Sequence, residues 1–174
     1  MRMRHPLLTL TLLGMLGATP GMGQAPKPAA CATTEYRQFD FWLGDWDSYD
    51  TEKPDSSVAR LRVELILDGC VLREVYEGKN GLLGQSFSMF DASRKLWHQS
   101  WVTNRGQLLQ LDGAMQGDRM VLSGPYPLPN GKVGLIRGIW YLVHDGVRET
   151  AETSEDGGKT WHPLFDLVFR IHRP

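Results

Sequence analysis

The chain has 174 residues, of which 41% are hydrophobic and 22% are charged. These values are ordinary for one folded domain and argue against a disordered chain. The formal net charge of −1 argues against the basic surface that nucleic acids or anionic membranes attract, so we expect neither partner.

The N-terminal segment, residues 1–23, has the pattern of a secretory signal peptide. Arg2 and Arg4 give it a basic start, residues 7–16 form an apolar run, and small residues precede Gln24. The apolar run is too short to span a bilayer, and we expect no membrane span. The pattern therefore predicts a periplasmic or secreted protein. A retained amphipathic anchor is the alternative.

The mature chain has room for one domain. Removing the signal peptide leaves roughly 150 residues, enough to bury an independent core. We predict a flexible tail over residues 24–34 and a single β-barrel domain over residues 35–174.

The chain has two cysteines, Cys31 and Cys70. In an oxidising compartment the default is that they form a disulfide. Closing a loop of this length stabilises a fold by about 4 kcal/mol in the chain-entropy model. Two free thiols are the alternative. Two cysteines cannot complete a zinc site alone, and we expect no metal site.

Turn-forming sequences recur at short, even intervals, centred near residues 54, 69, 80, 93, 105, 117, 129, 145 and 157. Such spacing predicts about ten short antiparallel strands joined by hairpins. The segments between turns are too short for the crossover helices of a parallel sheet. Only residues 35–43 could form a helical turn.

A meander of this length has two long exposed edges unless the sheet closes on itself. We therefore predict an all-β fold, an antiparallel up-and-down barrel of about ten strands with a short N-terminal helical turn. A barrel of this strand count has room for an internal cavity. A two-sheet sandwich is the alternative.

The motif Gly44-Asp45-Trp46 resembles the Gly-x-Trp entrance motif of lipocalins. In that family the tryptophan packs at the closed end of the barrel against an arginine from the last strand. The resemblance therefore implies structural roles for Gly44 and Trp46, and for Arg170 or Arg173 as the arginine.

A wider set of segments, FDFWLGDWD, LDGCVLREVYEG, SFSMFD, WHQSWV and TSEDGGKTWHPLFD, resembles an uncharacterised family of secreted bacterial proteins with a lipocalin-like (calycin) barrel. The chain is similar, more remotely, to nitrobindin-type barrels. The resemblance implies the fold and export, and it brings no established substrate.

The segment from Ser154 to Trp161 fits the Asp-box pattern, a structural β-hairpin of sialidases. Asp156 is expected to cap the turn backbone, and Trp161 to pack under the hairpin. A propeller needs several copies of this motif, and the chain has one. We predict a structural hairpin between the last two strands.

The histidines of the mature chain show no metal-binding spacing. The nitrobindin resemblance implies haem ligation by a single histidine, with His98 or His162 as candidates, and a surface or packed histidine is the alternative. We expect no cofactor, with haem as the less favoured possibility.

Trp97, Gln99 and Trp101 share one face of a predicted strand. Aromatic walls with a few polar groups are typical of small-molecule pockets. If a glutamate from another strand joins this face, its acidic side chain inside the barrel needs a partner, which Arg137 or Arg148 could supply. The alternative is ordinary barrel core with Gln99 hydrogen-bonded inside. Further candidate ligand-binding residues, from the third and ninth predicted strands, are Glu74, Tyr76 and Glu152.

Three functions fit this pattern. The first is an exported barrel that binds a small apolar or amphipathic molecule without transforming it. The second is a barrel enzyme that uses Glu74 or Glu152 as a general base of raised pKa. The third is an envelope interaction protein whose barrel is only a scaffold. Since no nucleophile–base pair is evident and the fold does not choose among functions, binding is favoured and no catalytic residue is assigned.

Overall fold

The computed structural model describes residues 30–129 and 131–173. The predicted signal peptide and residues 24–29 of the predicted tail lie outside the described residues. The regular elements are the 3-10 helices η1 (Thr34–Arg37), η2 (Asp40–Trp42) and η3 (Leu67–Gly69) and the strands β1 (Gly44–Asp50), β2 (Ser57–Ile66), β3 (Val71–Gly78), β4 (Leu83–Asp91), β5 (Leu96–Thr103), β6 (Leu108–Gln116), β7 (Arg119–Pro127), β8 (Val133–Val143), β9 (Gly146–Ser154) and β10 (His162–Ile171).

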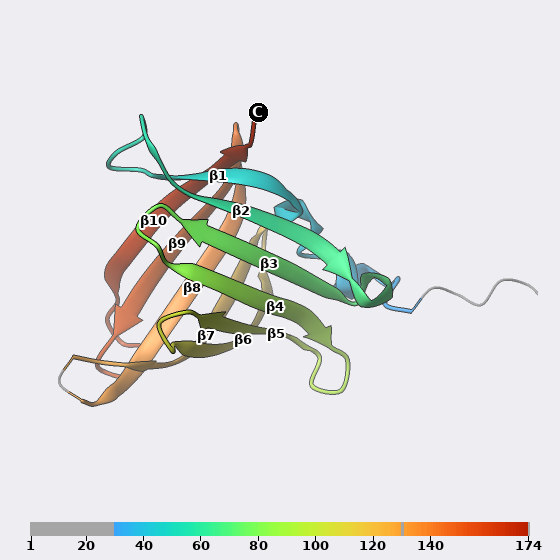
Figure 1. Ribbon diagram of the computed structural model, residues 1–174. Coiled ribbons are helices and arrows are strands. Elements are labelled where there is room, and N and C mark those ends of the chain that lie inside the picture. Colours follow the sequence, from blue (N-terminus) through green and yellow to red (C-terminus); the bar gives the residue numbers. More distant parts are fainter. Residues whose placement is uncertain (1–29, 130, 174) are drawn as a thin grey trace, which may run out of the picture.

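The ten strands form one closed antiparallel barrel (Figure 1). Each strand pairs with the next along the chain, and β1 pairs with β10 to close the sheet. The predicted all-β barrel with a helical turn near its N-terminus is therefore confirmed, and the sandwich alternative is wrong. Along the part of the chain that the structure describes, no helix is long and apolar enough to cross a membrane.

One end of the barrel is closed by aromatic side chains from the 3-10 segment. The Phe39 ring stacks on Trp42, with 5.1 Å between centroids, and meets Trp97 edge-on at 5.7 Å and Trp140 at 5.5 Å. Phe39 and Trp42 are fully buried. Offset and edge-on ring pairs of this kind add to the stabilisation from burial. Figure 1 shows the 3-10 turns (blue) at this end, with the β1–β2 and β3–β4 loops at the other.

The Gly-x-Trp motif belongs to this closed end. Trp46 is buried, and its indole Nε1–H donates to the Trp42 carbonyl oxygen at 3.1 Å. The Trp46 ring lies directly over Gly44, where an added Cβ would be 2.5 Å from a ring carbon. A side chain at residue 44 would therefore displace the indole, which explains the glycine of the motif.

The expectation that Arg170 covers Trp46 is wrong. The register pairs Ile171 with Trp46 and Arg170 with Asp47. The Arg170 side chain therefore lies on the face of the sheet opposite to Trp46. On the outer surface its guanidinium lies 4.7 Å from the Tyr49 ring centroid. The other candidate arginine, Arg173, follows β10 and is exposed.

The predicted Cys31–Cys70 disulfide is present, with 5.1 Å between the Cα atoms. It joins the segment before η1 to the turn between η3 and β3. Arg37 of η1 also donates to the Gly69 carbonyl oxygen beside this bond. The segment that closes the barrel is thus covalently linked to the sheet.

Intact mass measurement without reductant should show the oxidised protein two hydrogens lighter than the reduced protein. The physical reason is that both cysteines are consumed in one bond, since no free cysteine is present among the described residues. Treatment with an alkylating reagent should add nothing before reduction and two groups after it. Two thiols that react without reductant would contradict the pairing.

The Asp-box segment forms the hairpin between β9 and β10. Asp156 Oδ1 accepts from the backbone N–H groups of Lys159 and Thr160, both at 2.9 Å. These bonds, with one from the Thr160 hydroxyl, hold the pKa of Asp156 well below its usual range. Trp161 donates to the Gly158 carbonyl oxygen at 3.0 Å, and Arg137 lies 4.1 Å above its ring. The contacts of this motif lie within the hairpin and with neighbouring β8.

Candidate functional site

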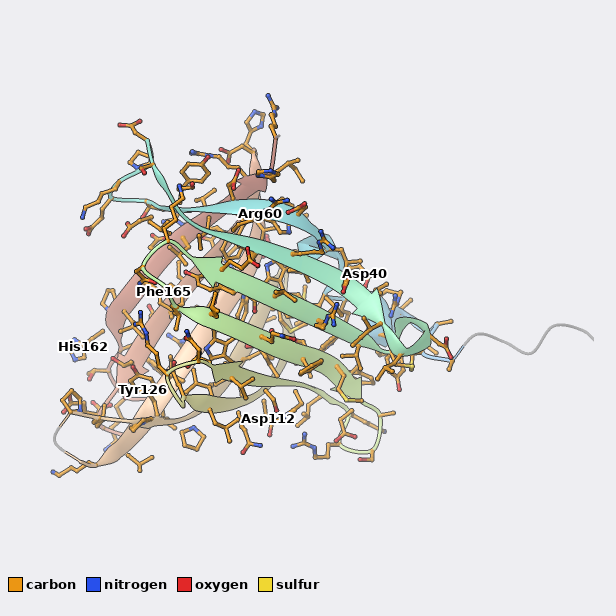
Figure 2. The ribbon with its side chains drawn as sticks, in the orientation of Figure 1. Asp40, Arg60, Asp112, Tyr126, His162 and Phe165 are labelled. Carbon is orange, nitrogen blue, oxygen red and sulfur yellow. A yellow bond between two sulfur atoms is a disulfide. The ribbon has the colours of Figure 1, made fainter. Side chains whose placement is uncertain are left out.

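A cavity of about 760 Å³ occupies the barrel interior beyond the aromatic closed end. Pockets for small molecules usually lie between about 300 and 1,000 Å³. The cavity reaches the loops at the open end, where Lys79 and Gln107 lie on its rim. Figure 2 shows the lining residues Tyr126 and Phe165 toward this end and Asp40 at the opposite end.

A second hollow lies on the outer surface across β3, β4 and β5. Outward-facing residues such as Val75, Phe87 and Val102 line it, and Glu77 is the one charged lining residue in the described part of the chain. This hollow is smaller and more open to solvent than the cavity inside the barrel. The interior cavity is therefore the candidate site.

Two indoles lie against the cavity wall because glycines make room for them. An added Cβ at Gly84 would be 2.2 Å from the Trp101 ring, and one at Gly138 would be 2.5 Å from the Trp140 ring. Tyr76 meets Trp101 edge-on, with 5.8 Å between ring centroids. The lumen between these aromatic walls consequently stays open.

Glu74 enters the cavity from β3. Only 6% of its surface is exposed, and the Ser86 hydroxyl donates to its Oε2 at 2.8 Å. Burial raises the pKa of Glu74 to about 7, and the bond from Ser86 opposes this rise. Over the described ranges, none of the salt bridges includes Glu74. Its carboxyl therefore faces the cavity without a cationic partner.

Glu149 enters the same cavity from β9, between the inward-facing Val147 and Ala151. Burial raises the pKa of Glu149 well above its usual value, and the charge of Glu74 raises it further. The indole N–H of Trp140, the cross-strand neighbour of Glu149, acts to lower the pKa of Glu149. The Trp140 nitrogen is buried and has no hydrogen-bond partner among the residues that the structure describes.

Gln99 supplies a third polar group. Its Nε2 donates to the Ser88 hydroxyl at 3.0 Å. Among the described residues this is the one side-chain hydrogen bond of Gln99, and the residue lines the cavity. Its amide oxygen is thus available as an acceptor for a bound molecule.

Four of the six predicted ligand-binding residues line the cavity: Glu74, Tyr76, Gln99 and Trp101. Trp97 shares the inward face of β5, as parity predicted, but it lies deeper. It is 1% exposed, packs on Phe39, and donates from its indole to Gln38 Oε1 at 3.1 Å. Trp97 therefore belongs to the closed-end core.

The assignment of Glu152 to the cavity is wrong. Its carboxylate accepts from Arg137 on the outer face, with 3.1 Å between Arg137 Nε and Oε2. On β9 the inward residues are Val147, Glu149 and Ala151, so Glu152 has the opposite parity. Glu149 was missed, although the small apolar residues two positions on either side of it were a usable signal.

The two candidate haem ligands do not reach the cavity. His98 lies on the outer face of β5, where its ring nitrogens contact Asp112 Oδ1 at 2.7 Å and Ser100 Oγ at 2.9 Å. His162 is exposed at the start of β10. These residues do not fit a haem in this cavity.

The chain matches no model of a protein family, and no curated protein matches it. The functional conclusion therefore depends on the chemistry of the cavity.

Proposed function

We propose that the protein is an exported, lipocalin-like barrel that binds a small amphipathic molecule in its interior without transforming it. The observation that carries this proposal is the 760 Å³ cavity, whose lining is mainly apolar and aromatic and includes the polar side chains of Glu74, Gln99 and Glu149. Sites for small molecules commonly have this composition. The Cys31–Cys70 disulfide supports export, because such bonds persist in oxidising compartments.

The polar groups of the wall restrict the ligand. A purely aliphatic molecule would cover Glu74 and Gln99 without pairing them, and an unpaired buried polar group costs about 1–3 kcal/mol. The ligand is therefore expected to carry at least one hydrogen-bonding group.

Native mass spectrometry of the protein purified from its own periplasm tests the proposal. We expect an adduct of one small molecule that is lost on denaturation. Trp101→Ala should weaken its retention, whereas Leu142→Ala, on an exposed outer residue, should retain it. A protein that carries no adduct and binds none of the octyl compounds named below would contradict the proposal.

Tryptophan fluorescence should report binding directly. Titration with octan-1-ol, which does not absorb in the tryptophan range, should shift the emission of the native protein because Trp101 lines the cavity. Trp101→Ala should reduce this shift and leave the part that comes from Trp140, which also lines the cavity, while the circular dichroism spectrum stays unchanged. Trp161→Ala, in the β9–β10 hairpin, is the control and should keep the shift. An unchanged shift in Trp101→Ala would show that the bound molecule does not lie against Trp101.

Acid–base catalysis is the second candidate, and the pKa of Glu74 near 7 favours it. A group with such a pKa is suited to proton transfer at neutral pH. Incubation of the co-purified molecule with fresh protein separates the two functions. A binding protein returns the molecule unchanged, whereas an enzyme converts it and loses this activity in Glu74→Gln.

A further inference from the structure

We infer that the bound molecule is an amphipathic amine, whose protonated nitrogen lies between Glu74 and Glu149 and whose apolar body fills the rest of the cavity. This inference rests on the proposed function and specifies the chemical class of the ligand.

The two carboxyls converge from well-separated strands. Glu74 is on β3 and Glu149 on β9, and three strands, β2, β1 and β10, lie between them along the shorter way around the barrel. The charges of both carboxyls act on the phenol of Tyr76, whose pKa they raise together with burial. Glu74 and Glu149 therefore share one region of the lumen.

Among the described residues, no cationic side chain of the cavity wall lies beside this pair. Lys79 is the one basic residue of this lining, and it lies on the rim, where its Nζ donates to the Ser57 hydroxyl at 2.6 Å. The strands that pair with β3 and β9 present no ionisable side chain to the cavity. The other ionisable lining residues in the described part of the chain are Asp50, Tyr76 and Tyr126.

A buried donor without a partner among the described residues lies beside Glu149. The Trp140 side chain is 2% exposed, lines the cavity, and leaves its indole N–H without a partner. This N–H lies near Glu149 and favours its carboxylate. A bound cation would favour the same charged form, and an ionised Glu149 could then accept from Trp140.

The remaining wall fits the apolar body of such a ligand. Beyond the two carboxyls, the lining includes the aliphatic side chains Leu109, Leu111, Ile136 and Leu167. An anionic ligand would place like charges together, whereas an ammonium group donates charge-assisted hydrogen bonds to carboxylates. The cavity therefore favours a cationic head on an apolar body.

Binding of the amine should release protons from the carboxyl pair. Near neutral pH Glu74 is partly protonated, and a neighbouring ammonium favours the carboxylate, so the displaced proton passes to the buffer. The amine itself remains protonated, because alkylamines titrate near the pKa of lysine, about 10.4. Amine affinity is consequently expected to rise from pH 5 to pH 8.

Isothermal titration of three matched probes, octylamine, octan-1-ol and octanoate, tests the inference. We expect the native protein to bind octylamine about 10- to 100-fold more tightly than the other two, the range that charge-assisted hydrogen bonds provide. Titrations in two buffers of different ionisation enthalpy should show proton release for octylamine alone.

Glu149→Gln and Glu74→Gln should each reduce the preference for octylamine about tenfold or more and leave octan-1-ol affinity unchanged. Glu152→Gln, which alters a carboxylate on the outer face, is the matched control and should change nothing. Octan-1-ol or octanoate binding as tightly as octylamine would overturn the amine inference and leave the proposed function standing. An amine preference that survives both variants would also overturn it. Failure of all three probes, with no co-purified adduct, would instead refute the proposed function.

Discussion

Trp46→Ala should lower the free energy of unfolding by about 3–5 kcal/mol, the usual cost of truncating a large buried aromatic side chain. Trp46 is 5% exposed and belongs to the aromatic core at the closed end. The change also removes the donor to the Trp42 carbonyl oxygen. Urea unfolding followed by circular dichroism measures the loss.

Trp161→Ala is the appropriate control for this experiment. It removes the same side chain from a partly exposed position in the β9–β10 hairpin, so a clearly smaller loss is expected. A loss below about 1 kcal/mol for Trp46→Ala would show that the closed end is not packed as described, since surface substitutions usually cost about 0.5 kcal/mol or less.

The free energy of unfolding should fall as pH rises from about 5 to about 8. The folded-state pKa of Glu74 is raised to about 7, so between its unfolded value of 4.5 and this value the native state holds a proton that the unfolded state has lost. Each such proton gives a slope of about −1.4 kcal/mol per pH unit. Glu74 alone would therefore cost roughly 3 kcal/mol over the window. Glu149 adds a loss of the same sign, because its pKa is also raised.

Urea unfolding at several pH values measures this profile, and glutamine variants identify its source. Glu74→Gln and Glu149→Gln should flatten the profile and increase stability at pH 8 relative to the native protein. Glu152→Gln should leave the profile unchanged, since its carboxylate pairs with Arg137 on the outer face. A profile that is flat, or that rises through this window, would mean that neither carboxyl is buried as the structure has it.

The sequence predicted the barrel because turn residues carry local information. Positive backbone φ angles at Gly81, Gly106, Gly117 and Gly157 coincide with four of the predicted turns, where glycine meets a conformational need. Strand parity then grouped Glu74 with Tyr76, and Gln99 with Trp101, on shared faces, since side chains alternate strictly across a sheet. Which faces point inward became clear only from the structure.

Depth and register were harder to predict. Parity separates the two faces of a strand but gives no position along the barrel axis, so Trp97 could not be distinguished from Trp101. On β9 both faces carry polar residues, so the polar residue types alone do not show which face is inside. In the structure Glu152 pairs with Arg137 on the outer face, and Glu149 lies on the inner face. The position of Arg170 depends on how β10 pairs with β1, which the sequence does not give. The register pairs Ile171, not Arg170, with Trp46, and a shift of one residue moves a side chain to the other face of the sheet.

The glycines beneath Trp101 and Trp140 make the width of the lumen adjustable by single methyl groups. At either position an alanine would meet the indole at less than 3 Å, so the ring would have to swing inward. Under the proposed function, an alanine at residue 84 or 138 would thus change the girth of the ligand that fits and keep the same carboxyl pair. Under the proposed function, ligand size and ligand charge are selected at separate positions of the cavity wall, so that either can change without the other.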